Sequence, residues 1–230
     1  RRLEELLSKH LETVLTLGTF HSICARILRQ EARHLGYTKN YSIYDSEDQL
    51  SLVKKAMEQL DISNKKFNPY GILSRISALK SELIEPDDFE PKANNFYDKI
   101  VHKIYAVYQT ELKEANAMDF DDLIILTVKL FKESSDILEK YQNQFHYILV
   151  DEYQDVNISQ YMLVKILSQK HKNLFVIGDT DQSIYMFRNA DFRNMLNFEK
   201  DFPDAKIIKL EQNYRSTKTI LAAAQGVINN

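Results

Sequence analysis

The chain has 230 residues, of which 44% are hydrophobic and 27% are charged, a composition that excludes a disordered or collagen-like protein. No apolar run approaches the ~20 residues of a membrane-spanning helix, so we expect no transmembrane segment and no membrane partner. The 30 basic and 33 acidic residues give a net charge of −3. Bulk charge therefore does not indicate a nucleic-acid-binding protein, and any nucleic acid must bind in a local groove.

Helices and strands alternate in the first 45 residues. In chain order, the apolar pattern predicts a helix over residues 1–10, a strand over 14–20, a helix over 22–35 and a short strand over 41–44. Ser46 and Gln49 then form a capping-box pattern at the start of a different region. Further helices are predicted there over residues 46–60, 69–84 and 93–115. We therefore expect an all-helical block over residues 46–116.

Strands return after the helical block. The pattern predicts a helix over residues 119–132, followed by apolar runs at 147–150, 174–178 and 207–210. Apolar runs separated by helices are typical of strands buried in a parallel sheet. The expected fold class is therefore α/β, with a parallel sheet that is flanked by helices and interrupted by an all-helical insertion.

Two acids, Asp151 and Glu152, directly follow the apolar run at 147–150. The carboxyl ends of strands in α/β sheets hold ligands. An aspartate there can bind Mg²⁺ beside phosphate groups, and a neighbouring glutamate can activate a water molecule. The alternative is a strand that merely ends in acids, and the pair alone does not decide between the two.

A second polar segment follows Gly178. It carries Gln182 and then Tyr185, Phe187 and Arg188. Two rings beside a cation suit single-stranded nucleic acid, because the rings can stack on bases while the cation binds phosphate. The alternative is that both rings belong to the core.

Three segments together carry a family resemblance. Residues 151–157 read Asp-Glu-Tyr-Gln-Asp-Val-Asn, residues 178–188 read Gly-Asp-Thr-Asp-Gln-Ser-Ile-Tyr-Met-Phe-Arg, and residues 213–216 read Asn-Tyr-Arg-Ser. In this order they resemble successive motifs of the UvrD/Rep/PcrA family of superfamily 1 DNA helicases. The Thr-Phe-His-Ser run at 19–22 resembles the family's DNA-contacting segment, and Asp-Phe-Asp-Asp-Leu at 119–123 resembles a further family signature.

The resemblance implies roles residue by residue. Asp151 would bind Mg²⁺, Glu152 would activate the attacking water, and Gln182 would sense the γ-phosphate of ATP and couple it to DNA. Arg215 would contact the γ-phosphate, and Tyr214 would stack near the adenine. The residues implied to contact single-stranded DNA are Thr19, His21, Tyr185, Phe187 and Arg188. A simpler role is expected for the acids at 119, 121 and 122, which would cap and solvate the start of a helix.

The resemblance also implies a fold and a function. Residues 1–45 and 117–212 would form a RecA-like domain, residues 46–116 an insertion subdomain, and residues 213–230 the entry to a second RecA-like domain. The parent protein would be an ATP-dependent DNA helicase or translocase, moving 3′ to 5′ along single-stranded DNA and unwinding at junctions with duplex DNA. Its pathway stays open between DNA repair, replication restart, recombination and plasmid maintenance. The alternatives are the motor of a RecB/AddA-type helicase–nuclease and a non-catalytic motor remnant that holds DNA or a partner.

Two features lead us to expect an internal piece of a longer helicase. The P-loop that cradles ATP phosphates needs a glycine followed by lysine, and none of the five glycines precedes a lysine. The predicted helix at Arg1 also lacks a capping residue. The chain alone is therefore expected not to hydrolyse ATP. The single cysteine, Cys24, is expected to pack inside a helix and fits a reducing, cytoplasmic setting.

Overall fold

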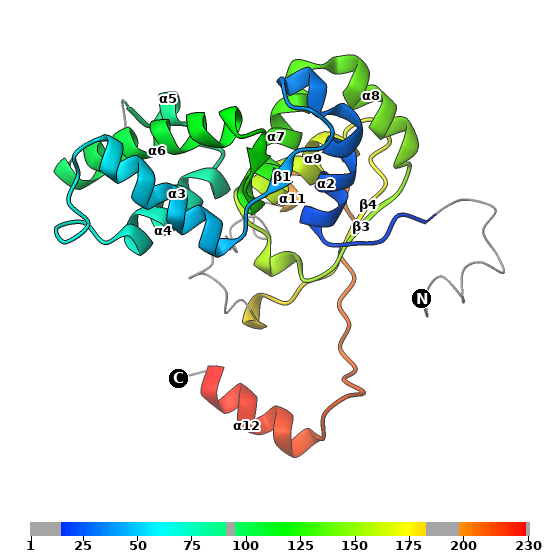
Figure 1. Cartoon of the computed structure of the whole chain (residues 1–230). Helices are drawn as coiled ribbons and strands as arrows, with labels where there is room; N and C mark the ends of the chain where they lie inside the picture. The colour runs from blue at the N-terminus through cyan, green and yellow to red at the C-terminus, as the bar shows by residue number, and fades with distance from the viewer. Residues whose placement is uncertain (1–14, 91–94, 183–197, 229–230) are drawn as a thin grey trace. The chain divides into compact units, whose positions relative to one another are not determined.

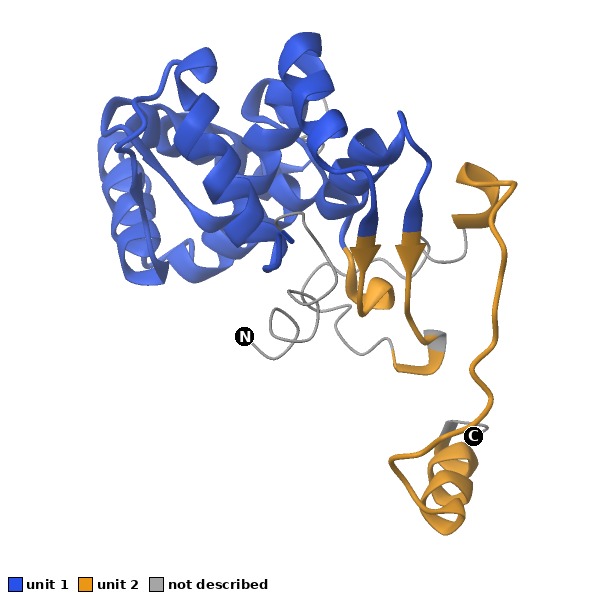
Figure 2. Cartoon of the chain, turned by 90° about the vertical axis from the view of Figure 1, so that its right-hand side faces the viewer, with its two compact units in different colours: residues 1–148, 157–174 blue, residues 149–156, 175–230 orange. Residues whose placement is uncertain are grey.

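The computed structural model of the chain describes residues 15–90, 95–182 and 198–228 (Figure 1). Most of these residues are helical, and the strands are short. Across the described ranges, no helix is long and apolar enough to cross a membrane. The chain divides into two compact units (Figure 2): unit 1 comprises residues 1–148 and 157–174, and unit 2 comprises residues 149–156 and 175–230.

The first described helix of unit 1 is α2 (Phe20–Glu31), which continues into the 3₁₀ turn η1 (Ala32–Leu35). Thr19 caps α2, because its Oγ1 accepts a hydrogen bond of 3.3 Å from the Ser22 N–H. Gly36 ends η1 in the left-handed conformation, with φ at 74°, which glycine adopts without strain. These bounds confirm the helix predicted over residues 22–35 and its end at Gly36.

The prediction of a strand over residues 14–20 is wrong for residues 15–20, the part that the structure describes. Residues 15–19 form no strand, and Phe20 already belongs to α2. The carbonyl of Leu17 accepts its hydrogen bond from the Arg26 guanidinium at 3.0 Å. The apolar alternation was therefore not enough to make a strand, which requires a partner for its backbone groups.

A parallel pair of two-residue strands flanks the helical block. Strand β1 (Ser42–Ile43) pairs with β2 (Ala117–Met118), with Ser42 opposite Ala117 and Ile43 opposite Met118. β1 confirms the strand predicted over residues 41–44. β2 was not predicted, because two apolar residues before a helix carry no recognisable alternation.

Within the described part of the stretch between β1 and β2, every regular element is a helix (Figure 1, cyan to green). These helices are α3 (Ser46–Gln59), α4 (Pro69–Ser81), α5 (Pro86–Phe89) and α6 (Phe96–Glu114). They share an apolar core formed by buried side chains that include Val53, Met57, Ile72, Ile76, Leu79, Ile104 and Tyr108. Pro69 takes the first position of α4 as predicted, where its missing N–H costs nothing.

The capping box of α3 lies one residue before the predicted one. Asp45, not Ser46, is the N-cap, and its Oδ1 accepts hydrogen bonds from the N–H groups of Glu47 (2.9 Å) and Asp48 (3.0 Å). Asp48 Oδ2 accepts the Asp45 N–H at 3.2 Å and completes the box. Both pairs have the required spacing of three residues, but only Ser46 and Gln49 also have the usual residue types of a capping box, so the sequence pattern favoured the wrong pair.

The other large helices of unit 1 are α7 (Phe120–Glu133), α8 (Ser135–Gln144) and α9 (Ile158–Ser168). α7 contacts α2, α8 and α9, and most of its apolar side chains are buried. Cys24 of α2 belongs to this core, and burial raises the pKa of its thiol to about 12, so it packs as expected. α8 was not predicted.

Strands β3 (Ile148–Val150) and β4 (Leu174–Val176) form a second two-stranded sheet. The Ile148 N–H donates to Asn173 O and the Ile177 N–H donates to Val150 O, both at 2.9 Å. Residue numbers rise together along the two strands, so the pair is parallel. The runs at 147–150 and 174–178 therefore form strands as predicted.

Residues 205–210 of unit 2 form no strand, and Ile207, Ile208 and Leu210 are exposed. The strand predicted over residues 207–210 is therefore wrong. Unit 2 also contains the 3₁₀ turns η3 (Tyr153–Asp155) and η4 (Thr180–Gln182) and the helices α11 (Phe198–Asp201) and α12 (Lys218–Ile228). The described chain is thus mainly helical with small parallel sheets, which is compatible with an α/β domain but shows no continuous RecA-like sheet.

Candidate functional site

The end of β3 places Asp151 and Glu152 in an unusual turn. Glu152 has φ 50° and ψ 44°, a left-handed conformation that is uncommon for a residue with a Cβ. Its N–H donates to Asp151 Oδ1, and its carbonyl accepts the Asp155 N–H, both at 3.0 Å. Glu152 lies between a strand and a 3₁₀ turn and does not end a helix, where left-handed residues are common. Strained residues of this kind cluster at functional sites.

The turn is fastened to the residues that follow β4. The Tyr153 N–H donates to Ile177 O at 2.8 Å. The side chain of Gln154 makes two further bonds: its Nε2 donates to Glu152 Oε2 at 2.7 Å, and its Oε1 accepts the Asp179 N–H at 3.0 Å. Gln154 is buried, with 1% of its surface exposed, whereas Glu152 is exposed.

Asp179 extends this set of bonds to Gln182. Asp179 Oδ2 accepts from Gln182 Nε2 at 2.7 Å, and its Oδ1 accepts the Asp181 N–H at 3.0 Å. The Gln182 N–H also donates to Asp179 O at 3.1 Å. A continuous hydrogen-bond path therefore runs from Glu152 through Gln154 and Asp179 to Gln182, entirely within unit 2 (Figure 2, orange). The sequence singled out both ends of this path but gave no role to Gln154 or Asp179.

The predicted residues Tyr214 and Arg215 lie on an exposed turn of unit 2. Asn213 Oδ1 accepts the N–H groups of Arg215 and Ser216, both at 2.9 Å, an arrangement typical of an Asx turn. Tyr214 is 92% exposed. An open hollow of about 520 Å³ is lined by Gln182, Gln212, Asn213, Tyr214 and Arg215. The hollow thus brings Gln182 together with Asn213, Tyr214 and Arg215 of the Asn-Tyr-Arg-Ser motif.

The donor groups at the end of β3 fit Mg²⁺ held mainly by phosphates. Asp151 and Glu152 present exposed carboxylates, and Asp155 Oδ1 is buried without a hydrogen-bond partner in the described structure. Burial and the charge of Glu152 raise the pKa of Asp155. Among all the residues that the structure describes, no group of three or more histidine, cysteine or acid side chains could hold a metal ion. Mg²⁺ in nucleotide sites needs only one or two carboxylates, since phosphates and water complete its shell.

The predicted DNA-contacting residues are only partly described. Thr19 caps α2. His21, on the first turn of α2, packs edge-on against Phe120, with ring centroids 6.1 Å apart. Burial lowers the pKa of His21, so at neutral pH it is an uncharged hydrogen-bonding group rather than a cation. The other predicted contacts, Tyr185, Phe187 and Arg188, lie outside the described residues.

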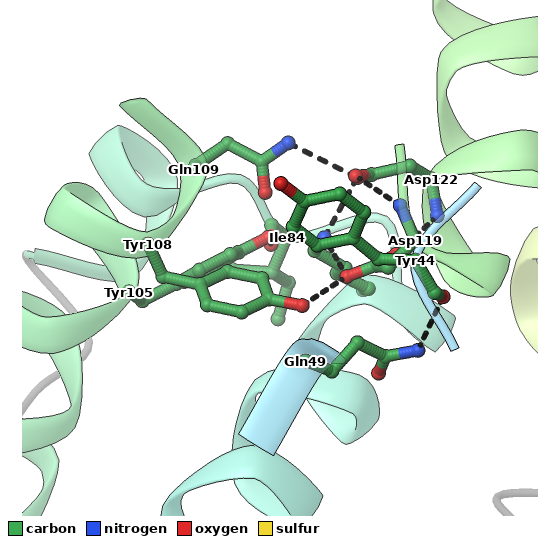
Figure 3. Close-up of polar contacts among 9 residues, drawn as sticks. Tyr44, Gln49, Ile84, Tyr105, Tyr108, Gln109, Asp119 and Asp122 are labelled. Atoms are coloured by element: carbon green, nitrogen blue, oxygen red, sulfur yellow. Dashed lines mark hydrogen bonds and ion pairs between the residues drawn. The ribbon is translucent and has the colours of Figure 1, made fainter. Parts of the chain in front are cut away.

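The acids after β2 differ from expectation. Asp119 caps α7 as predicted, since its Oδ1 accepts the Asp122 N–H at 2.8 Å. Asp119 and Asp122 do not face solvent, however, because each is only 1% exposed. Figure 3 shows Tyr108 and Gln109 of α6 directed at these acids, with Tyr108 Oη donating to Asp119 Oδ2 at 2.8 Å and Gln109 Nε2 to Asp122 Oδ1 at 3.1 Å.

Lys80 of α4 is the positively charged partner of these two buried acids. Its Nζ lies 2.6 Å from Asp119 Oδ2 and 2.7 Å from Asp122 Oδ1. Burial works to lower the pKa of Lys80, but the attraction of the two carboxylates outweighs it and holds that pKa well above its usual value. The single cation Lys80 faces two acids, so one negative charge is left over. Burial and the charge of Asp119 accordingly raise the pKa of Asp122 to about 6.

Known proteins resemble the chain along its length. The family model of the UvrD/REP helicase N-terminal domain matches residues 1–203. The ATP-dependent DNA helicase PcrA of Bacillus subtilis (strain 168) is 50% identical over 229 residues, and those of Staphylococcus aureus (strain Mu50) and Staphylococcus epidermidis are each 49% identical over the same length. Each match covers 100% of this chain and 31% of the relative. The chain therefore spans about a third of the length of these relatives.

Proposed function

Because the chain belongs to the UvrD/REP helicase N-terminal domain family, we propose that it forms part of the motor of an ATP-dependent DNA helicase. This motor couples ATP hydrolysis to 3′–5′ movement along single-stranded DNA and to unwinding at junctions with duplex DNA. The direction and the preference for junctions come from the family resemblance of the motifs at 151–157, 178–188 and 213–216.

One observation carries the proposal furthest: the hydrogen-bond path from Glu152 through Gln154 and Asp179 to Gln182. A motor must connect the group that attacks ATP with the group that reports on its γ-phosphate. The path supports this connection, because it joins the ends of two neighbouring parallel strands, where α/β proteins bind ligands.

In the proposed reaction, Asp151 holds the metal and Glu152 accepts a proton from the attacking water. When bound, Mg²⁺ neutralises charge on the β- and γ-phosphates. Gln182 and Arg215 contact the γ-phosphate, where an arginine stabilises the charge that develops during phosphoryl transfer. Tyr214 stacks on the adenine. The hollow shared by Gln182, Tyr214 and Arg215 supports their grouping.

The proposed DNA contacts are Thr19, His21, Tyr185, Phe187 and Arg188. Rings that stack on bases hold any sequence, which a motor that steps along DNA requires. An uncharged His21 on the first turn of α2 can donate a hydrogen bond to DNA without adding a fixed charge.

We also propose the domain boundaries: residues 1–45 and 117–212 for a RecA-like domain, 46–116 for an insertion subdomain, and 213–230 for the entry to a second RecA-like domain. The insertion is supported by the core of α3, α4, α5 and α6, which is distinct from the core around α7.

A chimera tests the proposed function. The matched 229 residues of the Bacillus subtilis relative are replaced by this chain, and unwinding is measured on duplexes with a 3′ or a 5′ single-stranded tail. The expected result is ATP-dependent unwinding of the 3′-tailed duplex and little of the 5′-tailed one. A folded chimera that binds single-stranded DNA but neither hydrolyses ATP nor unwinds would instead support a non-catalytic binding module.

A further inference from the structure

We propose that Gln154 is a positioning residue that ties Glu152 to the segment after β4, and that this tie sets how strongly single-stranded DNA stimulates ATP hydrolysis. The inference rests on the proposed function and names a means of regulating the same site. Gln154 itself touches neither water nor nucleotide in this account; it acts through Glu152.

The two bonds of the Gln154 amide fix its orientation. Its NH₂ group faces the carboxylate of Glu152, and its oxygen faces the N–H of Asp179. A flipped amide would direct its oxygen at a carboxylate and its NH₂ group at an N–H, so both contacts would be lost. Because Gln154 is 1% exposed, water cannot readily replace either partner. A buried amide that loses a partner is costly, so the tie is stiff.

Glu152 needs such a tie. It is exposed and sits on a left-handed backbone, so the strand and turn alone leave its carboxylate free to turn into solvent. The bond from Gln154 Nε2 to Glu152 Oε2 is short, at 2.7 Å, and its acceptor is a carboxyl oxygen. It leaves Glu152 Oε1 as the oxygen available to water.

Asp179 carries the connection onward. Its backbone N–H holds Gln154, while its carboxylate holds Gln182 Nε2 and the Asp181 N–H. A displacement of Asp179 must therefore act on the base at one end and on Gln182 at the other. In the sequence, Tyr185 follows Gln182 by three residues, so a proposed DNA contact begins directly after this path.

Two variants separate the tie from simple packing. Gln154→Met keeps an unbranched side chain of similar length but removes both hydrogen bonds. Gln154→Glu keeps an acceptor for the Asp179 N–H but replaces the donor with a charge that repels Glu152. The matched control is Gln142→Met, because Gln142 is also buried and its Nε2 donates to Ile166 O at 2.8 Å, away from the path.

The chimera that carries the full chain is assayed for kcat and KM of ATP hydrolysis, with and without saturating single-stranded DNA. Both Gln154 variants should lower the DNA-stimulated kcat by roughly 10- to 100-fold, the cost of misplacing a catalytic group, with KM for ATP changed by less than about twofold since no contact to nucleotide is lost. The ratio of kcat with DNA to kcat without DNA should fall as well. Gln142→Met should lower the melting temperature and leave that ratio unchanged.

Unchanged stimulation in both Gln154 variants would overturn the inference. So would equal losses with and without DNA that follow the melting temperature, because this is what a purely structural glutamine predicts. If the unmodified chimera hydrolyses no ATP, the proposed function fails instead. The tie is then tested on the 230-residue chain by amide hydrogen exchange. The Asp179 N–H should exchange faster in Gln154→Met than in the parent chain, and at the parent rate in Gln142→Met. The same exchange rate at Asp179 in the two variants would refute the tie.

Discussion

Lys80 Nζ lies 2.6 Å from Asp119 Oδ2, and the two side chains are 0% and 2% exposed. The pair joins α4 of the helical block to the N-cap of α7, the helix that contacts α2, α8 and α9. Asp122 shares the same cation at 2.7 Å. The helical block and the core around α7 are therefore connected by charge as well as by apolar packing.

Removing this cation should be strongly destabilising. Lys80→Met leaves two carboxylates buried without a counter-ion, and breaking a buried pair by removing one partner typically costs about 3–5 kcal/mol. Urea unfolding of the 230-residue chain measures the loss. Lys55→Met is the control, because its ion pair with Glu111 lies at the surface, where such pairs contribute little. Equal stability of the two variants would contradict the assigned importance of Lys80.

The local part of the fold was predictable. The helices α4 and α7 begin where local signals predicted, with Pro69 in the first turn of α4 and Asp119 as the cap of α7, because such signals lie within a few residues of the helix start. Strands depend on partners elsewhere in the chain. The apolar runs at 14–20 and 207–210 therefore look the same in sequence as the runs that became β3 and β4.

The site was predictable only at its ends. Asp151, Glu152 and Gln182 follow apolar runs, which marks them in sequence. Gln154 accepts its second bond from a residue 25 positions away, and no local pattern announces that contact. Lys80 did carry a signal: it follows Ile72 and Ile76 at intervals of four on the buried face of α4, where a charge requires a partner. The partners, 39 and 42 positions away, could not be named.

Stability should depend on pH through Asp121. Burial and the nearby charge of Asp119 raise the pKa of Asp121 from 3.8 to about 6, so the folded chain binds more protons than the unfolded chain between about pH 4 and 6. Protonated Asp121 therefore stabilises the fold at low pH, and this contribution is lost as the pH rises through 6. Ionised Asp121 should cost roughly 3 kcal/mol at pH 7.

Asp121→Asn should accordingly be more stable than the parent chain at pH 7, with the difference shrinking toward pH 4. Chemical unfolding at about pH 4.5, 5.5 and 7 measures how the free energy of unfolding of each variant changes with pH, over roughly the interval in which Asp121 titrates. Asp136→Asn, which changes an exposed acid on α8, serves as the control. A difference between Asp121→Asn and the parent that is independent of pH would show that Asp121 does not titrate as described.

Phe187 should contribute to single-strand affinity by stacking. Base–aromatic stacking is worth roughly 1–3 kcal/mol per base, so Phe187→Ala in the 230-residue chain should weaken binding about tenfold or more, similarly for different base compositions. Phe198→Ala is the control, because Phe198 packs against Tyr153 and Phe202 and should lower the melting temperature without changing affinity. If Phe187→Ala behaves like Phe198→Ala, Phe187 is a core residue and not a DNA contact.

The central claim is that Glu152 is the base of a DNA-stimulated ATP hydrolase, and steady-state phosphate release by the chimera tests it most directly. With saturating single-stranded DNA, Glu152→Gln should lower kcat by about 10²–10⁴-fold, the usual cost of losing a general base, while ATP and DNA binding persist because Asp151 and the proposed DNA contacts remain. The 230-residue chain assayed alone should release no phosphate above background, since none of its glycines precedes a lysine. A Glu152→Gln chimera that keeps more than about half of the parent kcat would contradict the account, since loss of a base cannot be so mild.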